Sequence, residues 1–414
     1  MVLNTSITYH DGQLTVDQHA ISTIIDEVGT PTYIYSLPRA LSNYAQIKAQ
    51  FEAIQPHIHY SVKANGNLAV LRALIKAGAG VDVVSGGEFF RALKAGAKGE
   101  DIVFAGVGKT PEDIRYALEN GVGWFNVENV DELDIINQQA QAAGVSSVKI
   151  AMRLNPDVKA NTHHHIATGH GTAKFGLSVA IIRDILQNQT KYANLRFAGI
   201  HLHIGSQLQD TQATLQALQS AIDLIRPYPD IQTVNIGGGI PVAYRPDEQL
   251  PDIEQFAALI APTLQPYTVF MEPGRSIIAD AGVLITRVLY VKEQAGQRIA
   301  IVDASMTELI RPALYQAYHH IVPIKQTSAA TVPTQVVGPV CESTDILSQE
   351  VALPIDLKHG DLLAILTAGA YGMVMASTYN ARPRPAEVVV DVDDSQWSIA
   401  RRRETWDDLV KQEE

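Results

Sequence analysis

The stretch His57-Ile58-His59-Tyr60-Ser61-Val62-Lys63-Ala64-Asn65-Gly66-Asn67 shows the unit from which most of the chain is built. Apolar residues at every second position from Ile58 to Val62 predict a short strand. Residues 64–67 carry turn-forming types, and leucines with helical spacing follow them. Lys63 therefore stands where a strand gives way to a loop. Burying an ammonium group at such a position costs the free energy of removing its water, unless the amine has a function there. This stretch alone therefore leaves two interpretations open: a lysine that takes part in chemistry, or one whose ammonium reaches solvent at the edge of the sheet.

The same unit of strand, turn and amphipathic helix recurs as far as residue 272. Thr110 followed by Pro111 marks the start of one helix, as an N-cap before a proline at the first helical position does. The predicted strands are Ile58–Val62, Val81–Val84, Ile102–Ala105, Trp124–Val127, Val148–Leu154, Phe197–His203, Thr233–Ile236 and Thr268–Glu272. Eight consecutive units favour an α/β fold of the parallel (β/α)8 TIM-barrel type, which we expect over residues 32–279.

The pattern changes after Gly282. A long β-type run at 283–291 is followed by further β-rich runs, and helical spacing becomes sparse. These runs predict a second, mainly antiparallel β domain made of residues 280–414. Residues 1–31 precede the barrel and need a partner, so we expect them to join the β domain.

Composition limits the classes of function. The chain has 414 residues, and its net charge of −12 argues against binding to a nucleic-acid backbone. No apolar run is long enough to span a membrane, and the first residues lack the pattern of a signal peptide. The only cysteine, Cys341, cannot form an intrachain disulfide, which suits a reducing compartment. We therefore expect a cytoplasmic protein that acts on small molecules.

Chemically versatile side chains gather at the predicted carboxyl ends of the barrel strands, where barrels of this kind place their active sites. Gly237-Gly238-Gly239 offers three backbone amides that can close around a phosphate. A phosphate site together with the strand-end Lys63 points to pyridoxal phosphate held covalently by the amine. Glu272 then suits the pyridine nitrogen, and His203 suits one face of the ring. Taken alone, a triple glycine is more often a flexible turn and a strand histidine is more often part of a core. Only the combination with Lys63 and Glu272 at the barrel rim favours chemistry.

Several ordered motifs carry a resemblance to a known family. They are His59-Tyr60-Ser61-Val62-Lys63-Ala64-Asn65, His201-Leu202-His203-Ile204-Gly205-Ser206-Gln207, Gly237-Gly238-Gly239, Glu272-Pro273-Gly274-Arg275, Gly338-Pro339-Val340-Cys341-Glu342-Ser343-Thr344-Asp345 and Gly369-Ala370-Tyr371. Together they resemble the fold-type III pyridoxal-phosphate decarboxylases, over about residues 32–384. The resemblance implies decarboxylation of meso-2,6-diaminopimelate to L-lysine and carbon dioxide, the last step of lysine biosynthesis. It also implies a homodimer in which each β domain completes the partner's site.

The resemblance further implies a role for each matching position. The implied catalytic residues are Lys63, His203 and Cys341, the last as a proton donor from the neighbouring subunit. The implied cofactor-binding residues are Lys63, Asp82, His203, Ser206, Gly237, Gly238, Gly239, Glu272, Gly274, Arg275 and Tyr371. The implied substrate-binding residues are Arg275, Arg311, Tyr315, Glu342 and Tyr371. In this scheme Asp82 supports His203, Arg311 and Tyr315 bind a substrate carboxylate, and Glu342 binds the distal amino group.

The segment from Asn155 to Gly176 is long and contains His163, His164 and His165. Adjacent histidines do not readily face one ion, and no cysteine or carboxylate set accompanies them, so we expect no metal. The glycines in this segment favour a lid between the fifth and sixth strands instead.

Three other functions compete with this interpretation. The first is decarboxylation of another basic amino acid, such as ornithine, arginine or carboxynorspermidine. The second is a non-catalytic relative that binds partners, but such proteins typically lose the lysine or the cysteine, and both are present here. The third is a racemase on a related barrel, which would place an arginine rather than Glu272 beside the ring nitrogen.

Overall fold

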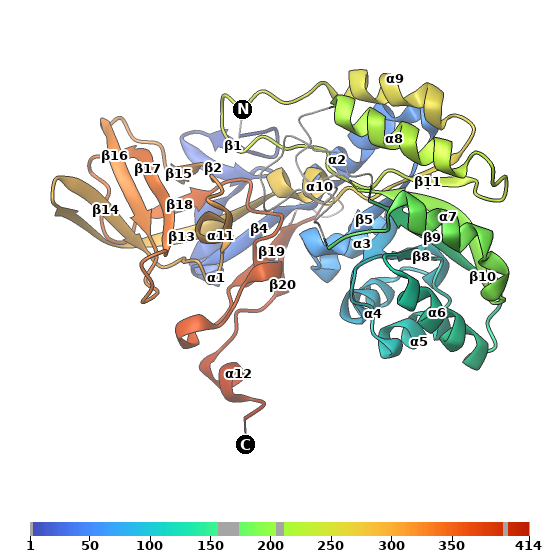
Figure 1. Cartoon of the computed structure of the whole chain (residues 1–414). Coiled ribbons are helices and arrows are strands. Elements are labelled where there is room, and N and C mark those ends of the chain that lie inside the picture. The colour runs from blue at the N-terminus through green and yellow to red at the C-terminus, as the bar shows by residue number, and fades with distance from the viewer. Residues whose placement is uncertain (1–2, 156–173, 204–210, 392–395, 414) are drawn as a thin grey trace. The chain divides into compact units, whose positions relative to one another are not determined.

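The computed structural model describes residues 3–155, 174–203, 211–391 and 396–413. The chain forms two compact units (Figure 1). The barrel unit contains Tyr44–Pro241 and Leu250–Ser276, and the β unit contains Met1–Asn43, Val242–Gln249 and Ile277–Glu414. The described residues include no helix that combines the length and apolar character required to cross a membrane.

The barrel unit is built on a closed barrel whose strands all run parallel, in the order β10-β11-β12-β5-β6-β7-β8-β9. Its strands are β5 (His57–Ser61), β6 (Gly80–Val83), β7 (Ile102–Phe104), β8 (Trp124–Val127), β9 (Val148–Leu154), β10 (Leu195–Leu202), β11 (Thr233–Asn235) and β12 (Thr268–Met271). Each predicted strand is present, which confirms the predicted (β/α)8 class. Side chains of Val103, Trp124, Ala151, Ala198 and Phe270 form one core cluster among these strands.

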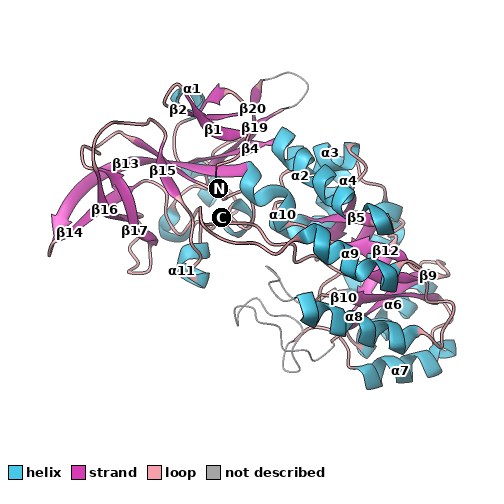
Figure 2. Cartoon of the chain, turned by 90° about the horizontal axis from the view of Figure 1, so that it is seen from above, coloured by secondary structure: helices cyan, strands magenta, loops and turns pink. Residues whose placement is uncertain are grey.

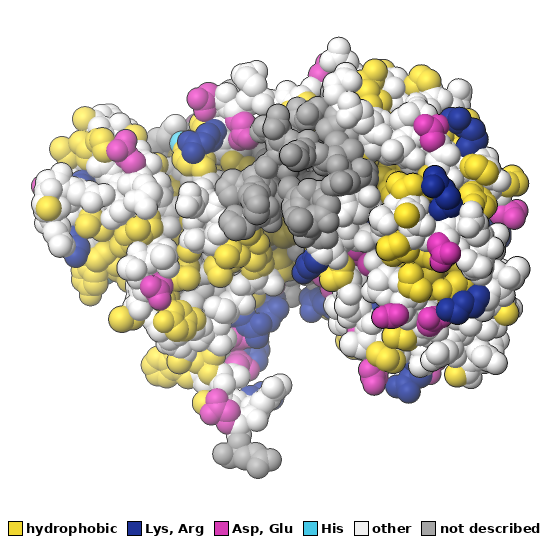
Figure 3. Space-filling model, viewed as in Figure 1, with side chains coloured by type: hydrophobic (Ala, Val, Ile, Leu, Met, Phe, Trp, Pro, Cys, Tyr) yellow, Lys and Arg dark blue, Asp and Glu magenta, His cyan; other side chains and the backbone are white. Residues whose placement is uncertain are grey.

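Helices surround the strands of the barrel unit (Figure 2). They are α3 (Leu68–Lys76), α4 (Gly86–Ala95), α5 (Pro111–Glu119), α6 (Val130–Ala142), α7 (Val179–Gln187), α8 (Thr211–Ile225) and α9 (Ile253–Leu264), while α2 (Leu37–Gln50) runs from the β unit into this one. Thr110 and Asp113 form a reciprocal capping box at the start of α5, as the Thr-Pro sequence predicts. Gly96 ends α4 with a φ of 102°, a conformation that favours glycine. On the face seen in Figure 3, acidic and basic side chains of the barrel unit are interspersed.

The β unit contains one large sheet with the main path β17-β16-β14-β13-β4-β19-β20. Its strands are β4 (Thr32–Ser36), β13 (Gly282–Gln294), β14 (Gln297–Val302), β15 (Ile321–Pro323), β16 (Thr331–Val337), β17 (Ile346–Pro354), β18 (Leu362–Ile365), β19 (Ala386–Val390) and β20 (Trp397–Arg401). Two pairs, β14–β16 and β4–β19, are parallel, and the other pairs are antiparallel. The predicted mainly antiparallel β domain is confirmed.

The first residues of the chain belong to the β unit, as expected, and form a small sheet. This sheet contains β1 (Ile7–His10), β2 (Gln13–Val16) and β3 (His19–Ala20), and α1 (Ile21–Val28) follows it. Their apolar side chains pack with Ile34, Val283 and Val388 in a common core. The remaining helices of the chain are short: α10 (Arg275–Ile278), α11 (Arg311–Tyr315) and α12 (Trp406–Val410).

The unit boundaries differ from those expected at residues 32 and 279. Strand β4 pairs with β13 and β19, so it belongs to the β unit. All five of its residues are buried. A strand that is covered on both faces shows no alternation of apolar and polar residues, and its sequence therefore does not reveal which sheet it joins.

Candidate active site

The carboxyl ends of the barrel strands carry the polar cluster that the sequence predicts. Lys63 lies in a short 3-10 turn, Val62–Ala64, directly after β5, and Asp82 lies in β6. His203 follows β10, and Glu272 follows β12. Parallel strands of a barrel end at the same rim, so residues far apart in the sequence meet there. We call Lys63, Asp82, His203 and Glu272 the rim cluster.

Asp82 links the lysine to the adjacent strand. Its Oδ2 accepts a hydrogen bond of 2.6 Å from Ser61 Oγ and lies 3.4 Å from Lys63 Nζ. The carboxyl group is fully buried, whereas the Lys63 side chain is 37% exposed. Burial, and then repulsion from Glu272, raise the pKa of Asp82 to about 6, although Lys63 and Ser61 act against the shift. We expected Asp82 to support His203, but these hydrogen bonds connect it to Ser61 and Lys63.

Glu272 is held as a carboxylate in a buried position. Its Oε1 accepts hydrogen bonds from Asn126 Nδ2 at 2.8 Å and Asn235 Nδ2 at 2.5 Å, and its Oε2 lies 3.3 Å from His201 Nε2. Burial alone would raise the pKa of Glu272, but His201, Lys63 and the bond from Asn235 outweigh it and hold the pKa well below its usual range. A buried carboxylate that stays ionised can hold a proton on a neighbouring basic nitrogen.

His203 is kept neutral. The backbone N–H of Gly238 points at His203 Nδ1 across 3.3 Å, so this nitrogen accepts and the ring proton resides on Nε2. Burial, followed by the positive charges of Arg153 and Lys63, lowers the pKa of His203 well below the ordinary value. A neutral imidazole beside a lysine suits stacking on a flat ring, as the sequence predicts for this residue.

The Gly237–Gly239 run has the shape expected of an oxyanion cradle. Gly237 and Gly239 have φ values of 69° and 95°, in the left-handed region that favours glycine. A Cβ atom on Gly238 would lie 2.4 Å from the carbonyl oxygen of Glu272. Side chains are therefore excluded on steric grounds, and backbone amides line the turn. These features, with the lysine and the buried carboxylate, fit pyridoxal phosphate.

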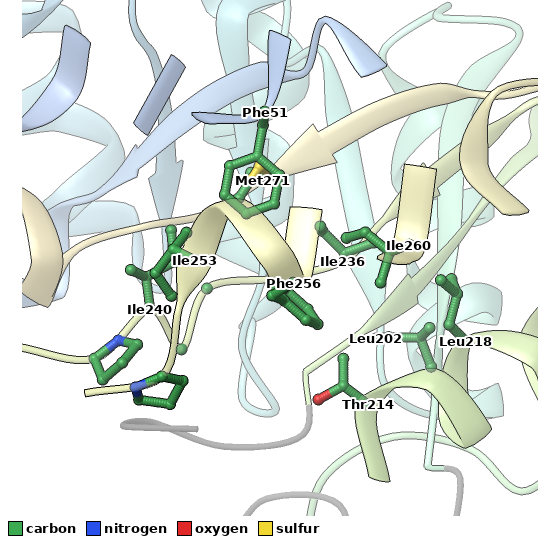
Figure 4. A pocket seen from close by; sticks show the side chains of 14 residues that line it. Phe51, Leu202, Thr214, Leu218, Ile236, Ile240, Ile253, Phe256, Ile260 and Met271 are labelled. Carbon is green, nitrogen blue, oxygen red and sulfur yellow. The ribbon is translucent and has the colours of Figure 1, made fainter. Parts of the chain in front are cut away.

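An apolar pocket lies behind the glycine run (Figure 4). Gly238 and Gly239 form part of its wall, and the labelled side chains of Phe51, Phe256 and Met271 project into it. Apart from Thr214 and the backbone of the two glycines, the lining is apolar, so an anion placed among these side chains would lose water and gain few hydrogen bonds. The pocket therefore belongs to the back of the loop rather than to the polar site.

Gly274 and Arg275 follow Glu272 directly. A Cβ atom on Gly274 would approach the Cβ atoms of Ala64 and Ser61 to 3.0 Å, so glycine lets this segment pass close to the turn that carries Lys63. The carbonyl of Pro273 accepts a hydrogen bond from the Ser61 N–H at 3.2 Å, which fixes the same approach. Arg275 begins α10 and is half-buried.

The other predicted site residues lie in the β unit. Arg311 is buried, with its guanidinium 4.6 Å from the centre of the Tyr244 ring and its Nη1 2.8 Å from His319 Nε2. Tyr315 and Tyr371 are half-buried, and Tyr371 has a φ of 57°. Cys341 and Glu342 are exposed, and the backbone N–H of Cys341 donates to Asn380 Oδ1. Ser206 and the histidines at 163–165 lie outside the described residues.

Three residues that contact Glu272 were not predicted as site residues: Asn126, Asn235 and His201. A signal was present for Asn126, because a buried asparagine interrupts the apolar strand Trp124–Val127. A buried amide needs a partner, and its position near a strand end places that partner at the rim.

Three rim residues also have the spacing of metal ligands. One ligand atom each of His201, His203 and Glu272 lies within 4.8 Å of the others. Glu272 Oε1 is already bonded by two amides, and His203 Nδ1 accepts from Gly238. Glu272 and His203 suit the ring nitrogen and ring face of a pyridoxal cofactor, and His201 lies beside Glu272.

Comparisons with known proteins show the family to which this fold and sequence are similar. The family model described as "Pyridoxal-dependent decarboxylase, pyridoxal binding domain" matches residues 39–279. The diaminopimelate decarboxylase of Pseudomonas fluorescens is 42% identical over 97% of this chain and 96% of its own length, and that of Aquifex aeolicus is 39% identical over 99% and 97%. The crystal structure of diaminopimelate decarboxylase from M. jannaschii in co-complex with L-lysine superimposes with a TM-score of 0.93 at 34% identity, covering 100% of this chain and 99% of that one.

Proposed function

This chain belongs to the pyridoxal-dependent decarboxylases, and we propose that it converts meso-2,6-diaminopimelate to L-lysine and carbon dioxide. The observation that carries the proposal is the rim itself. A lysine amine, a neutral imidazole, an ionised buried carboxylate and a backbone oxyanion cradle occur together at one end of a barrel. Relatives of nearly full length carry the name diaminopimelate decarboxylase.

Pyridoxal phosphate, when bound, supplies an electron sink for the pair left at the α-carbon as carbon dioxide departs. Lys63 would hold the cofactor through its ε-amine. The Gly237–Gly239 turn would hold its phosphate through the N–H of Gly239, since the N–H groups of Gly237 and Gly238 point at Asn235 Oδ1 and His203 Nδ1. Glu272 would keep a proton on the ring nitrogen, because its own pKa is held low. His203, neutral and held by Gly238, would cover one face of the ring.

We assign substrate recognition to residues of the β unit together with Arg275. A guanidinium binds a carboxylate through two parallel hydrogen bonds, and Arg311 is held for such a task by Tyr244 and His319. Tyr315 would support the same carboxylate, Glu342 would bind the distal amino group, and Tyr371 and Arg275 would contact cofactor or substrate. The thiol of Cys341 would give its proton to the α-carbon, replacing the carboxylate that has left.

Parallel assays with meso-diaminopimelate, ornithine and arginine test the substrate. We expect carbon dioxide and L-lysine from diaminopimelate, with much slower release from the other two. Release from ornithine or arginine without release from diaminopimelate would instead support the alternative decarboxylase. A protein that binds pyridoxal phosphate but releases no carbon dioxide from any of them would contradict both.

We also propose a homodimer in which Cys341 and Glu342 of one subunit serve the site of the other, in the cytoplasm. The exposed position of both residues supports this, since an exposed pair can meet a second chain. Mixing Lys63→Ala with Cys341→Ala subunits tests it. If sites are shared, random exchange restores about a quarter of the wild-type activity, because one site of each mixed dimer carries neither substitution. No recovery after proven subunit exchange would refute shared sites.

A further inference from the structure

The carboxylate of Glu272 is held by two amides from very different places in the barrel. Glu272 follows β12. Asn235 is the last residue of β11, which neighbours β12, whereas Asn126 lies in β8, four strands from β12 around the barrel. Both donate to Glu272 Oε1, at 2.5 and 2.8 Å. All three side chains are at most 3% exposed. One oxygen of the carboxylate is thus held by two uncharged donors from different strands.

Asn235 makes a second contact that Asn126 does not share. Its Oδ1 accepts the backbone N–H of Gly237 at 2.9 Å. The carbonyl of Gly237 in turn accepts the N–H of Glu272 at 2.8 Å. The Oδ1 of Asn126, by contrast, has no hydrogen-bond partner among the described residues. One amide side chain therefore spans the carboxylate and the glycine run, and the other touches the carboxylate alone.

This difference matters for a rigid ligand. In pyridoxal phosphate the ring nitrogen and the phosphate are held at a nearly fixed separation, so the carboxylate and the glycine run must be correctly placed at the same time. A residue bonded to both sets their relative position before the ligand arrives, which reduces the cost of binding.

We propose that Asn235 is a positioning residue that sets the spacing between Glu272 and the phosphate-binding Gly237–Gly239 run, while Asn126 positions Glu272 alone. The inference rests on the proposed function, because it takes pyridoxal phosphate as the ligand. Neither asparagine is assigned a contact with the cofactor or the substrate.

Three variants separate the two contacts. Asn126→Ala removes one bond to Glu272 and leaves the glycine run as it is. Asn235→Ala removes the bonds to Glu272 and to Gly237. Asn235→Asp keeps an oxygen that can accept from Gly237 but turns an acceptor toward Glu272, so it breaks the link between the carboxylate and the glycine run while keeping the bond to Gly237. Circular dichroism and thermal unfolding establish that each variant is folded.

The measurement is the advantage that the phosphate group gives in binding. The full-length protein is stripped of cofactor and titrated with pyridoxal phosphate and with pyridoxal, which lacks the phosphate. The ratio of the two dissociation constants reports the glycine run. We expect Asn235→Ala to reduce this ratio about tenfold or more, as loss of a bond that orders a charge-binding loop does. Asn126→Ala should keep the wild-type ratio within about threefold, whereas Asn235→Asp, in which the bond to Glu272 is broken, should reduce the ratio. Both variants should shift the pH dependence of the cofactor's visible absorbance.

Equal ratios in Asn126→Ala and Asn235→Ala would overturn the inference, and so would a wild-type ratio in Asn235→Asp, because the bond to Gly237 alone would then suffice. If Asn235→Ala does not fold, Asn235→Asp still decides, because the inference requires its ratio to lie below that of Asn126→Ala. A wild-type protein that binds pyridoxal phosphate no better than pyridoxal, or that releases no carbon dioxide, would instead count against the proposed function.

Discussion

Two lysines of the barrel unit lie in contrasting surroundings. Lys109 has a fully buried side chain, and its ammonium donates to the carbonyl of Gly106, the carbonyl of Asn126 and the carboxylate of Glu132, at 2.6 to 2.8 Å. Lys63 has a side chain that is 37% exposed and lies 3.4 Å from Asp82. We call Lys109, Glu132 and the two carbonyls the buried lysine cluster, to set it beside the rim cluster.

The contrast separates structural use of a lysine from chemical use. In the buried lysine cluster each of the three ammonium protons has an acceptor at short distance, so the group has no capacity left for a ligand. At the rim the distance to the carboxylate is long, and the pKa of Asp82 is raised by burial and by Glu272. A structural ion pair minimises the electrostatic free-energy cost of a buried charge, whereas a reactive site keeps part of that cost until a ligand binds.

The largest expected effect follows from Lys63→Ala. Without the amine the cofactor has no covalent attachment, so decarboxylation should fall about a thousandfold or more. Thermal stability of the cofactor-free chain should change little, because the side chain is partly exposed and packs no core. Lys98→Ala is the matched control, since Lys98 pairs with Glu100 on the surface at 76% exposure and should leave activity as it is. Retained turnover in Lys63→Ala would refute the assignment.

The second effect concerns stability and comes from Lys109→Met. Removing one member of a buried ion pair leaves Glu132 uncompensated, which should cost about 3–5 kcal/mol in the free energy of unfolding. Turnover per folded molecule should fall far less than in Lys63→Ala. The double variant Lys109→Met, Glu132→Met should recover much of the loss, because the unpaired charge is gone. Urea unfolding measures the free energy of unfolding of the wild type, the single variant and the double variant. A single variant as stable as the wild type would remove the distinction between the two lysines.

A third, intermediate effect is expected from Asp82→Asn. The amide keeps an oxygen for Ser61 but loses the charge that faces Lys63. The folded chain holds the Asp82 proton up to about pH 6, compared with an ordinary value of 3.8, so the wild type loses stability as the pH rises through that window. The variant should lack this loss. It should also show kcat/KM about tenfold lower at neutral pH, without the acid limb near pH 6. An acid limb unchanged in the variant would assign it to another group.

Sequence periodicity was sufficient to find the barrel because its eight strands repeat one local pattern. Strand β4 shows why the domain boundary differed. Its residues are buried on both faces, so the pairing with β13 and β19 depends on contacts distant in the sequence. Local pattern identifies a strand, but the choice of partner is made by the tertiary structure.

The rim shows the same division between what is local and what is not. Lys63 and Glu272 could be predicted because each is a charged residue at the end of an apolar strand. Asn126 and Asn235 are neutral and carry no chemistry of their own. The asparagine that interrupts the apolar strand Trp124–Val127 indicates a polar partner near the strand end, but nothing in the sequence identifies that partner as Glu272. The neutral tautomer of His203 depends on the N–H of Gly238, a contact across 35 positions. Hydrogen-bond partners of this kind become visible only when the strands are assembled.

The smallest expected effect tests whether the electrostatic cost of the rim cluster extends to a neighbouring carboxyl group. Glu88, in α4, accepts the N–H of Val84 at 2.8 Å, and burial, then repulsion from Asp82, raise its pKa from 4.5 to about 7. Above pH 7 the folded chain carries a charge that it disfavours, so Glu88→Gln, which keeps an acceptor for Val84, should stabilise the protein by about 1 kcal/mol at pH 8. Near pH 4 the two proteins should be equally stable, because the wild-type carboxyl is then protonated in the folded state and largely so in the unfolded state. The matched control is Glu119→Gln on the surface, at 58% exposure, where no gain is expected. If Glu88→Gln gains no stability between pH 4 and pH 8 relative to the wild type, the electrostatic cost does not extend beyond the rim cluster into α4.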